Sequence, residues 1–262
     1  MTGMWQRGDS YEQYVGMWSR RVASSFLAWL DIPPRQRWLD VGCGTGALCA
    51  AILERCAPTF VVGVEPSAEY LDKAKEQLGS RVTFHRGTAD AIPLEDGAVD
   101  ATCSALMLNF VPDERAALAE MTRVTATGGT IAAYVWDYAG KMELMRCFWD
   151  AARELDPEAK AADEGVRFPS CNPGALKTAF AGAGLQAVDV TAIDIETPFA
   201  SFDAYWQPFL GAQGPAPAYA MSLEEPAREQ LRERLKKRLP IEPDGSIELN
   251  ARAWAVRGRV KR

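Results

Sequence analysis

Short apolar runs alternate with amphipathic stretches along the first half of the chain. Runs of four to eight apolar residues predict buried strands, and apolar residues recurring every three or four positions predict helices. The predicted strands are Trp38–Val41, Phe60–Val64, Val82–His85, Val99–Leu106 and Thr130–Tyr134, with helices at Ala47–Cys56, Ser67–Leu78 and Glu114–Thr122 between them. This strict alternation predicts a doubly wound α/β fold with a mostly parallel sheet, whose ligand crevice lies beyond the carboxyl ends of the strands.

The flanking segments have a different pattern. One or two helices are expected before the break at residues 31–34, and another helix at 141–155 is followed by a loop through 168–171. Asn172 and Pro173 then predict the start of a helix that ends at residues 182–184, and a strand follows at 185–195. Residues 202–239 look mainly helical, and the alternation over 246–260 is typical of a half-exposed antiparallel strand.

These elements predict a seven-stranded sheet with an antiparallel last strand, together with helical cap elements. We expect an N-terminal helical cap at 1–34, a core at 35–136 and 172–262 with a helical insertion at about 201–240, and an inserted cap segment at 137–171.

Composition narrows the range of partners. The 262 residues carry a formal charge of -6, which argues against a polyanionic partner such as nucleic acid. The basic run at 232–238 is interrupted by Glu229 and Glu233 at helical spacing, which favours a solvated helix face. No segment is apolar enough to predict a membrane span or a signal peptide, so a cytoplasmic protein is expected. The six scattered cysteines and single histidine suggest neither a metal site nor a disulfide framework.

A glycine-rich turn follows the first predicted strand. Gly42, Gly44 and Gly46 allow the backbone to approach a ligand closely there, Asp40 ends the strand, and Glu65 ends the next one. A carboxylate at the latter place can accept both hydroxyls of a ribose. A dinucleotide would bring its pyrophosphate toward Asp40 and be repelled, whereas the sulfonium and ammonium groups of S-adenosylmethionine suit that side chain.

Four segments in register carry a resemblance to a known family: Leu-Asp-Val-Gly-Cys-Gly-Thr-Gly at 39–46, Val-Gly-Val-Glu-Pro-Ser at 62–67, Gly-Thr-Ala-Asp-Ala-Ile-Pro-Leu at 87–94 and Thr-Gly-Gly-Thr at 127–130. Over about residues 37–136 the chain resembles the class I S-adenosylmethionine-dependent methyltransferases. Within them it is similar to the quinone-biosynthesis (type 11) branch, which implies a Rossmann-like fold and S-adenosylmethionine as cofactor.

The resemblance also implies places for the cofactor. Gly42 and Gly44 would line its methionine moiety, Glu65 would hold the ribose, and Pro66 would pack on the adenine. Thr88 stands where the family usually has Asp, and the backbone amide of Ala89 would reach the adenine ring. The predicted cofactor-binding set is Asp40, Gly42, Cys43, Gly44, Gly46, Glu65, Pro66, Thr88, Ala89, Ser104 and Arg20, in which the arginine suits the methionine carboxylate.

Three residues are candidates for catalysis. Asp137 follows a predicted strand and could orient or deprotonate an acceptor, or it could cap the helix near residue 141. Asn109 lies where relatives carry residues facing cofactor and acceptor, although a turn-forming Asn is an equal alternative. Tyr14 lies on the leading helices, where an aromatic face suits a sulfonium. For His85, the sole histidine, a structural role is favoured.

The predicted activity is in-line methyl transfer to a small molecule, promoted by positioning and exclusion of water. Aromatic residues in the predicted cap suggest an apolar or aromatic acceptor, and a monomer or homodimer is expected. The alternatives are a non-catalytic S-adenosylmethionine-binding module and, from another class, a nucleotide-dependent oxidoreductase.

Overall fold

The computed structural model describes residues 17–211 and 214–261, which fall into two compact units. The core unit contains Ser19–Val135, Asn172–Ile193 and the chain from Ala253 onward. The second unit contains Trp136–Cys171 and Asp194–Arg252.

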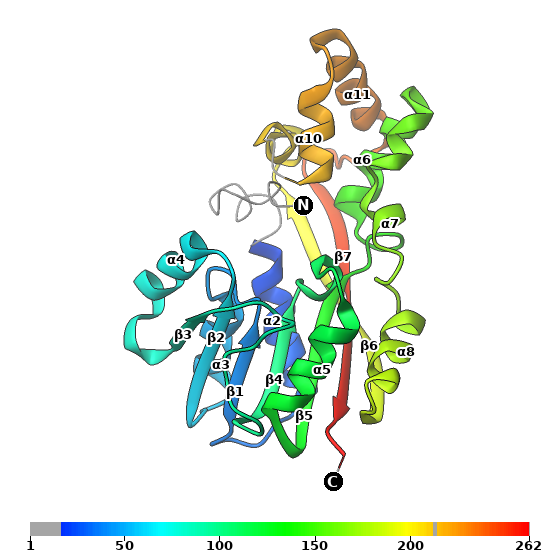
Figure 1. Ribbon diagram of the computed structural model, residues 1–262. Coiled ribbons are helices and arrows are strands. Elements are labelled where there is room, and N and C mark those ends of the chain that lie inside the picture. Colours follow the sequence, from blue (N-terminus) through cyan, green and yellow to red (C-terminus); the bar gives the residue numbers. More distant parts are fainter. Residues whose placement is uncertain (1–16, 212–213, 262) are drawn as a thin grey trace. The chain divides into compact units, whose positions relative to one another are not determined.

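Seven strands form one sheet in the described part of the chain, in the order β3-β2-β1-β4-β5-β7-β6 (Figure 1). The strands are β1 (Arg37–Val41), β2 (Phe60–Glu65), β3 (Thr83–Arg86), β4 (Val99–Ala105), β5 (Thr125–Trp136), β6 (Gln186–Phe199) and β7 (Ile247–Arg259). All pairings among β1 to β5 are parallel. This arrangement confirms the predicted fold class.

Strand β7 runs antiparallel to β5. At one end, Gly128 N donates to Val260 O and Val260 N donates to Gly129 O. At the other end, Asp137 N donates to Arg252 O, so residue numbers rise along one strand as they fall along the other. The last strand is therefore antiparallel, as its alternating pattern predicts.

Helices lie on both faces of the sheet in the core unit. Phe26 of α2 (Met17–Leu30) packs on Tyr134 of β5, with ring centroids 4.8 Å apart. Cys49 of α3 (Ala47–Arg55) donates to Asp40 of β1 on the same face. On the opposite face, the hydroxyl of Thr102 in β4 is hydrogen-bonded to that of Thr125, with 2.6 Å between the two Oγ1 atoms. Thr125 directly follows α5 (Glu114–Val124). The remaining helices of the unit are η2 (Gly79–Arg81), η3 (Leu108–Phe110), α4 (Ala68–Leu78) and α8 (Pro173–Gly182).

Side-chain caps fix where several of these helices begin. Ser67, Asp113 and Asn172 each accept a hydrogen bond from the backbone amide three residues later, at the starts of α4, α5 and α8. The cap at Asn172 and the Pro173 that follows it confirm the predicted start of α8. Helix α3 has no side-chain cap, because it begins directly after Gly46.

The second unit is built mainly from helices: α6 (Glu143–Leu155), η4 (Pro157–Ala161), α7 (Glu164–Arg167), α9 (Phe202–Trp206), η5 (Gln207–Gly211), α10 (Pro215–Ser222) and α11 (Glu225–Arg238). Aromatic side chains form its interior: Phe148, Trp149, Tyr205 and Phe209 are each fully buried, and Phe148 stacks on Phe209 at 4.5 Å. Many of the aromatic residues in the predicted cap therefore form the hydrophobic core of this unit.

One expectation for the second unit is wrong in part. The segment between α6 and Cys171 was expected to be a loop, but η4 and α7 lie within it. Each begins after an aspartate that caps it: Asp156 accepts from Glu158 N, and Asp163 accepts from Gly165 N. The two elements span only five and four residues, which is too short for an apolar period to be visible.

The basic run on α11 is ion-paired, as its interleaved glutamates predict. Arg232 contacts Glu229 at 3.2 Å, and Lys236 contacts Glu233 at 2.7 Å. Arg234 contacts Glu154 of α6 at 2.6 Å, so the helix is also tied to its neighbour.

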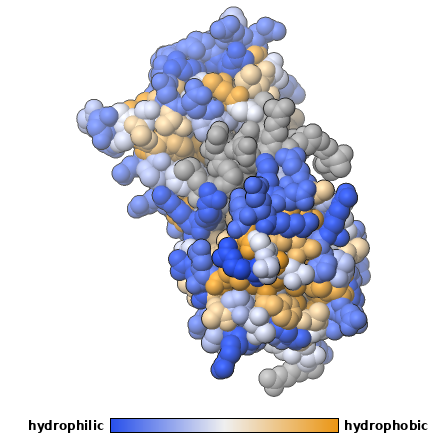
Figure 2. Space-filling model, turned by 90° about the vertical axis from the view of Figure 1, so that its left-hand side faces the viewer, coloured by the Kyte–Doolittle hydropathy of each residue, from blue (hydrophilic) through white to orange (hydrophobic). Residues whose placement is uncertain are grey.

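The surface mixes hydrophilic and hydrophobic residues, as the face drawn in Figure 2 shows. The exposed large apolar side chains among the described residues are Phe60, Phe110, Val166, Met221 and Ile241. Within residues 17–211 and 214–261, no helix combines the length and apolar character needed to cross a bilayer.

Candidate functional site

The turn between β1 and α3 depends on its glycines. Gly42, Gly44 and Gly46 have φ angles of 71°, 53° and 89°, a region that side-chain-bearing residues rarely adopt. A Cβ at Gly42 would lie 2.9 Å from Cβ of Met107 and closer still to its Cγ, so the turn packs directly against the chain after β4. A Cβ at Gly44 would meet nothing within 4 Å, so a ligand can approach the backbone at this residue.

Four amides of this turn are hydrogen-bonded within the protein. Gly42 N and Cys43 N donate to Val64 O at 2.8 and 3.1 Å, and Gly46 N donates to Cys43 O at 2.8 Å. Gly44 N donates to Glu65 Oε2 at 3.2 Å. These four amides are therefore not available to a pyrophosphate, which binds at free backbone N–H groups.

Asp40 is fully buried at the end of β1. Its Oδ2 accepts from Cys49 Sγ at 3.3 Å, while its Oδ1 has no partner among the described residues. Burial raises the pKa of Asp40 to about 7, the Cys49 hydrogen bond opposes that rise, and the charge of Glu65 adds to it.

Glu65 links the glycine turn to the start of α4. It is 8% exposed, and its Oε1 accepts from Ser67 N at 3.0 Å while Oε2 accepts from Gly44 N. Burial raises the pKa of Glu65, and these two backbone hydrogen bonds oppose the rise. Each carboxylate oxygen keeps a lone pair for a further donor. No ion pair involves Asp40 or Glu65 in the described part of the chain, so two acidic groups lie beside the turn without a cation.

The loop after β3 contains a short turn, and the segment that follows the turn is hydrogen-bonded to α5. Ala91 N donates to Thr88 O at 3.2 Å, with Thr88 exposed and Ala89 half-buried. Arg123 of α5 donates to the carbonyls of Ile92 and Leu94 at 2.9 and 2.8 Å. Thr88 and Ala89, the predicted adenine contacts, therefore lie on a loop that hydrogen bonds hold in place.

Ser104 near the end of β4 and Asn109 of η3 have no side-chain partner among the described residues. Ser104 Oγ and both amide atoms of Asn109 are buried without a hydrogen bond to any described residue. A buried polar group left unpaired costs about 1–3 kcal/mol, which marks this place as one where a ligand would satisfy them. Leu106, at a φ of 55°, turns the chain here, and its N–H is held by Tyr134 O at 2.9 Å.

Comparisons with known proteins agree with this geometry. Residues 39–133 match a family model described as a methyltransferase domain. The chain is 36% identical over 131 residues to an uncharacterised methyltransferase of Mycobacterium bovis, covering 49% of this chain and 52% of that protein. It is 34% identical over 125 residues to a demethylmenaquinone methyltransferase of Staphylococcus aureus, covering 47% and 50%. The chain thus spans about half the length of the curated relatives it matches.

Residues 39–133 are thus similar to a methyltransferase domain. This match confirms the predicted family resemblance over the segment that carries the four signatures.

Solved structures extend the likeness in fold beyond that domain. A putative methyltransferase of Bacillus halodurans superposes with a TM-score of 0.61 at 14% identity, covering 92% of this chain and 99% of that one. A phosphoethanolamine N-methyltransferase of Haemonchus contortus, solved with S-adenosylmethionine, has a TM-score of 0.61 at 15% identity, covering 97% and 56%.

Most of the predicted cofactor residues come together within residues 39–133. The turn with Cys43, the Glu65–Pro66 step, the Thr88–Ala89 turn and Ser104 all lie at or near the carboxyl ends of parallel strands β1 to β4. Pro66 is exposed, and its carbonyl accepts from Arg86 Nε at 3.1 Å. His85 is half-buried on β3, beside Val64.

The other three predicted residues are Arg20, Tyr14 and Asp137. Arg20 is exposed near the start of α2, and Tyr14 lies outside the described residues. Asp137 belongs to the second unit, where its Oδ1 and Oδ2 accept from Gly140 N and Lys141 N at 3.1 and 2.9 Å. Its carboxylate thus holds a turn just before α6, which resembles the alternative role as a helix cap. A role of Asp137 toward an acceptor stays a prediction.

Two neighbours of the turn were missed from sequence. Met107 packs against Gly42, and Cys49 donates to Asp40. Neither position carries a local signal, because each contact joins elements that are separate in sequence.

Proposed function

We propose that this chain is an S-adenosylmethionine-dependent methyltransferase that acts on a small molecule. The observation that carries the proposal is the acidic pair, Asp40 and Glu65, beside a glycine turn in which four amides are already hydrogen-bonded. Such a turn offers negative charge and close backbone approach, and the negative charge would repel a phosphate. The structural likeness to an enzyme solved with S-adenosylmethionine supports the choice of ligand.

The residues at this edge of the sheet fit the cofactor part by part. Asp40 would accept from the amino group directly or through a water molecule, and Gly44 would lie against the methionine moiety. Glu65 has one lone pair free on each oxygen, which suits the two ribose hydroxyls. Pro66 and the Thr88–Ala89 turn would flank the adenine, and Arg20 would reach the carboxylate.

When bound, the cofactor supplies a methyl group on a positively charged sulfur. The protein's share of the work is to align an acceptor with that carbon and to exclude water. Asn109 would orient the acceptor, because its amide can both donate and accept and has no partner among the described residues. We also propose that Asp137 and Tyr14 act on the acceptor, as their sequence positions predict.

We propose that the acceptor is apolar or aromatic. Phe110, next to Asn109 in η3, is an aromatic residue with 42% of its surface exposed. The buried aromatic residues of the second unit do not bear on this choice, since they pack on one another.

The test is calorimetric titration of the full chain with S-adenosylmethionine, S-adenosylhomocysteine and NAD⁺. We expect saturable binding of the first two and none of the third. Incubation with methyl-labelled cofactor and a panel of aromatic hydroxyl and amine compounds, read by mass spectrometry, then separates an enzyme from a binding module. Absence of affinity for both sulfur nucleosides would overturn the assignment, and binding without any labelled product would favour the module.

A further inference from the structure

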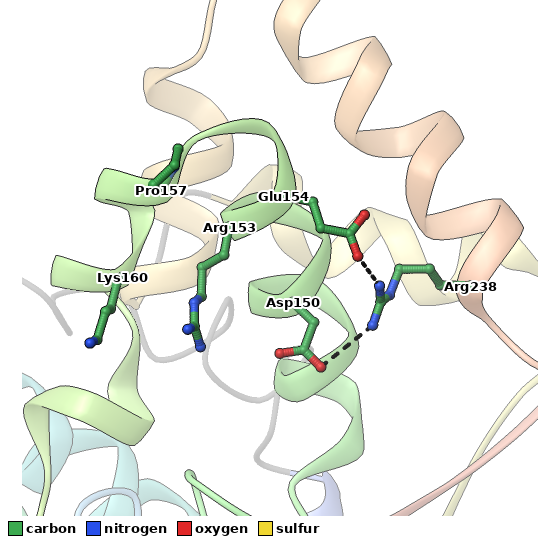
Figure 3. A pocket seen from close by; sticks show the side chains of 6 residues that line it. All are labelled: Asp150, Arg153, Glu154, Pro157, Lys160 and Arg238. Atoms are coloured by element: carbon green, nitrogen blue, oxygen red, sulfur yellow. Dashed lines mark hydrogen bonds and ion pairs between the residues drawn. The ribbon is translucent and has the colours of Figure 1, made fainter.

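A charged cavity of about 460 Å³ lies in the second unit, where α6 ends and η4 follows (Figure 3). The residues that line it are Asp150, Arg153, Glu154, Pro157, Lys160 and Arg238. All of them lie outside residues 39–133, and none belongs to the proposed methyl-transfer site.

The acidic residues of this cavity are already neutralised. Arg238 makes ion pairs with both Asp150, at 3.6 Å, and Glu154. Arg234 also binds Glu154, and its hydrogen bond is the main reason that the pKa of Glu154 lies below its usual value. The negative charges along one side of the cavity are therefore matched by arginines from α11.

The other two cations are not matched. Arg153 and Lys160 make no hydrogen bond or ion pair through their side chains with any residue that the structure describes. Figure 3 shows both side chains extending in the same direction from α6 and η4, while Glu154 and Asp150 turn toward Arg238. The cavity thus has two uncompensated positive charges in a protein whose net charge is -6.

The backbone that carries these two cations is held in place. Asp156, between α6 and η4, accepts from Glu158 N at 3.0 Å and from the Tyr219 hydroxyl at 3.3 Å. Ala159, next to Lys160, is 2% exposed and anchors η4. The backbone that carries Arg153 and Lys160 is therefore held, so that the ordering cost of binding a ligand falls mainly on their exposed side chains.

We propose that this cavity binds the phosphate group of a small phosphate monoester. The Arg153 guanidinium suits two phosphate oxygens at once, and the Lys160 ammonium adds a point charge. The volume is in the range of small-molecule sites and exceeds what a phosphate alone needs, so an organic group would lie over Pro157.

Titration of the full chain, monitored by ³¹P NMR and by calorimetry, tests this site. The probes are inorganic phosphate, glycerol 1-phosphate and phenyl phosphate. We expect saturable binding at one site, with the monoesters binding more tightly than inorganic phosphate. Affinity should fall between pH 7.5 and pH 5, because the second ionisation of a phosphate monoester lies near pH 6. Inorganic phosphate binding as tightly as both esters would overturn the assignment of an organic group.

Matched variants identify the residues responsible. Arg153→Ala and Lys160→Ala should each weaken binding by about tenfold. Lys177→Ala should leave it unchanged, because Lys177 is an exposed cation of α8 without a partner in the described structure. Thermal melts show whether each variant folds. The proposal is overturned by an absence of saturable binding, by an equal loss in Lys177→Ala, or by Arg153→Ala lowering the melting temperature with unchanged phosphate affinity. That last result would assign Arg153 to the carboxyl end of α6 instead.

Discussion

The ionisation of Asp40 should link cofactor affinity to pH. Burial raises the pKa of this carboxyl to about 7, so in the ligand-free protein it is largely protonated in mild acid. A ligand carrying an ammonium and a sulfonium favours the ionised form, and binding below pH 7 must therefore release the proton. Affinity is expected to rise as pH rises toward neutrality.

The magnitude follows from the protonated fraction. With a pKa of about 7, proton competition weakens binding about twofold at pH 7 and about thirtyfold at pH 5.5. The expected change across this window is thus roughly fifteenfold. The ligand's own amino group stays charged throughout, since α-amino groups titrate at about pH 8.

Calorimetry in two buffers with different heats of ionisation measures both quantities. Close to one proton released per ligand is expected at pH 5.5, and about half a proton at pH 7. Asp40→Asn should bind more weakly at pH 7 and lose this part of the pH dependence. An affinity that falls with rising pH, or an equal slope in Asp40→Asn, would refute the reasoning.

The same carboxyl should make the ligand-free protein less stable as pH rises. Its pKa is higher in the folded protein than the ordinary 3.8, so the folded state holds the proton more tightly than the unfolded chain. The resulting stability is fully present below about pH 4 and is lost as pH rises through about 7. Urea unfolding should therefore show Asp40→Asn gaining stability over the native protein at pH 8 and little at pH 4. An equal difference at both values would contradict this.

Three further outcomes are expected. Glu65→Ala should weaken cofactor binding by about 1–3 kcal/mol in calorimetry, and unchanged affinity would remove Glu65 from the site. Gly42→Ala should cost about 1–3 kcal/mol in urea unfolding, because of its positive φ and the contact with Met107; Gly44→Ala, where a Cβ meets nothing, should cost less, and equal costs would contradict the packing argument. Arg123→Ala should speed hydrogen exchange in the loop that it braces at residues 92–94, whereas unchanged protection would show that the loop does not depend on it.

Sequence predicted the sheet well because its central strands are buried on both faces. Strands β1 and β2 appear as plain apolar runs, and their measured bounds differ from the predicted ones by a single residue at one end. Strand β5 begins five residues earlier than predicted, at Thr125, since Thr-Ala-Thr-Gly-Gly carries no apolar run. The early part of β5 is instead fixed by its pairing with β4 and β7, which a single sequence does not display.

The site was predictable where its signals are local. The glycine turn, Asp40 and Glu65 follow from spacing and from the ends of two strands. The contacts that shape their chemistry are not local: Met107 lies 65 residues after Gly42, and the thiol of Cys49 reaches Asp40 from the next helix. For Asp137, the position after a strand is a local signal that is not sufficient. It does not reveal that both carboxylate oxygens accept hydrogen bonds from backbone amides of a turn.

The hydrogen bonds from the β1–α3 turn to Val64 and Glu65 affect the entropy of ligand binding. Since Val64 and Glu65 already restrain the backbone of residues 42–44, this stretch has its final conformation before any nucleoside is present. The entropy of ordering is lost once, during folding, and association does not incur it again. This part of the protein is therefore expected to behave as a rigid template, with adaptation to different acceptors confined to other segments.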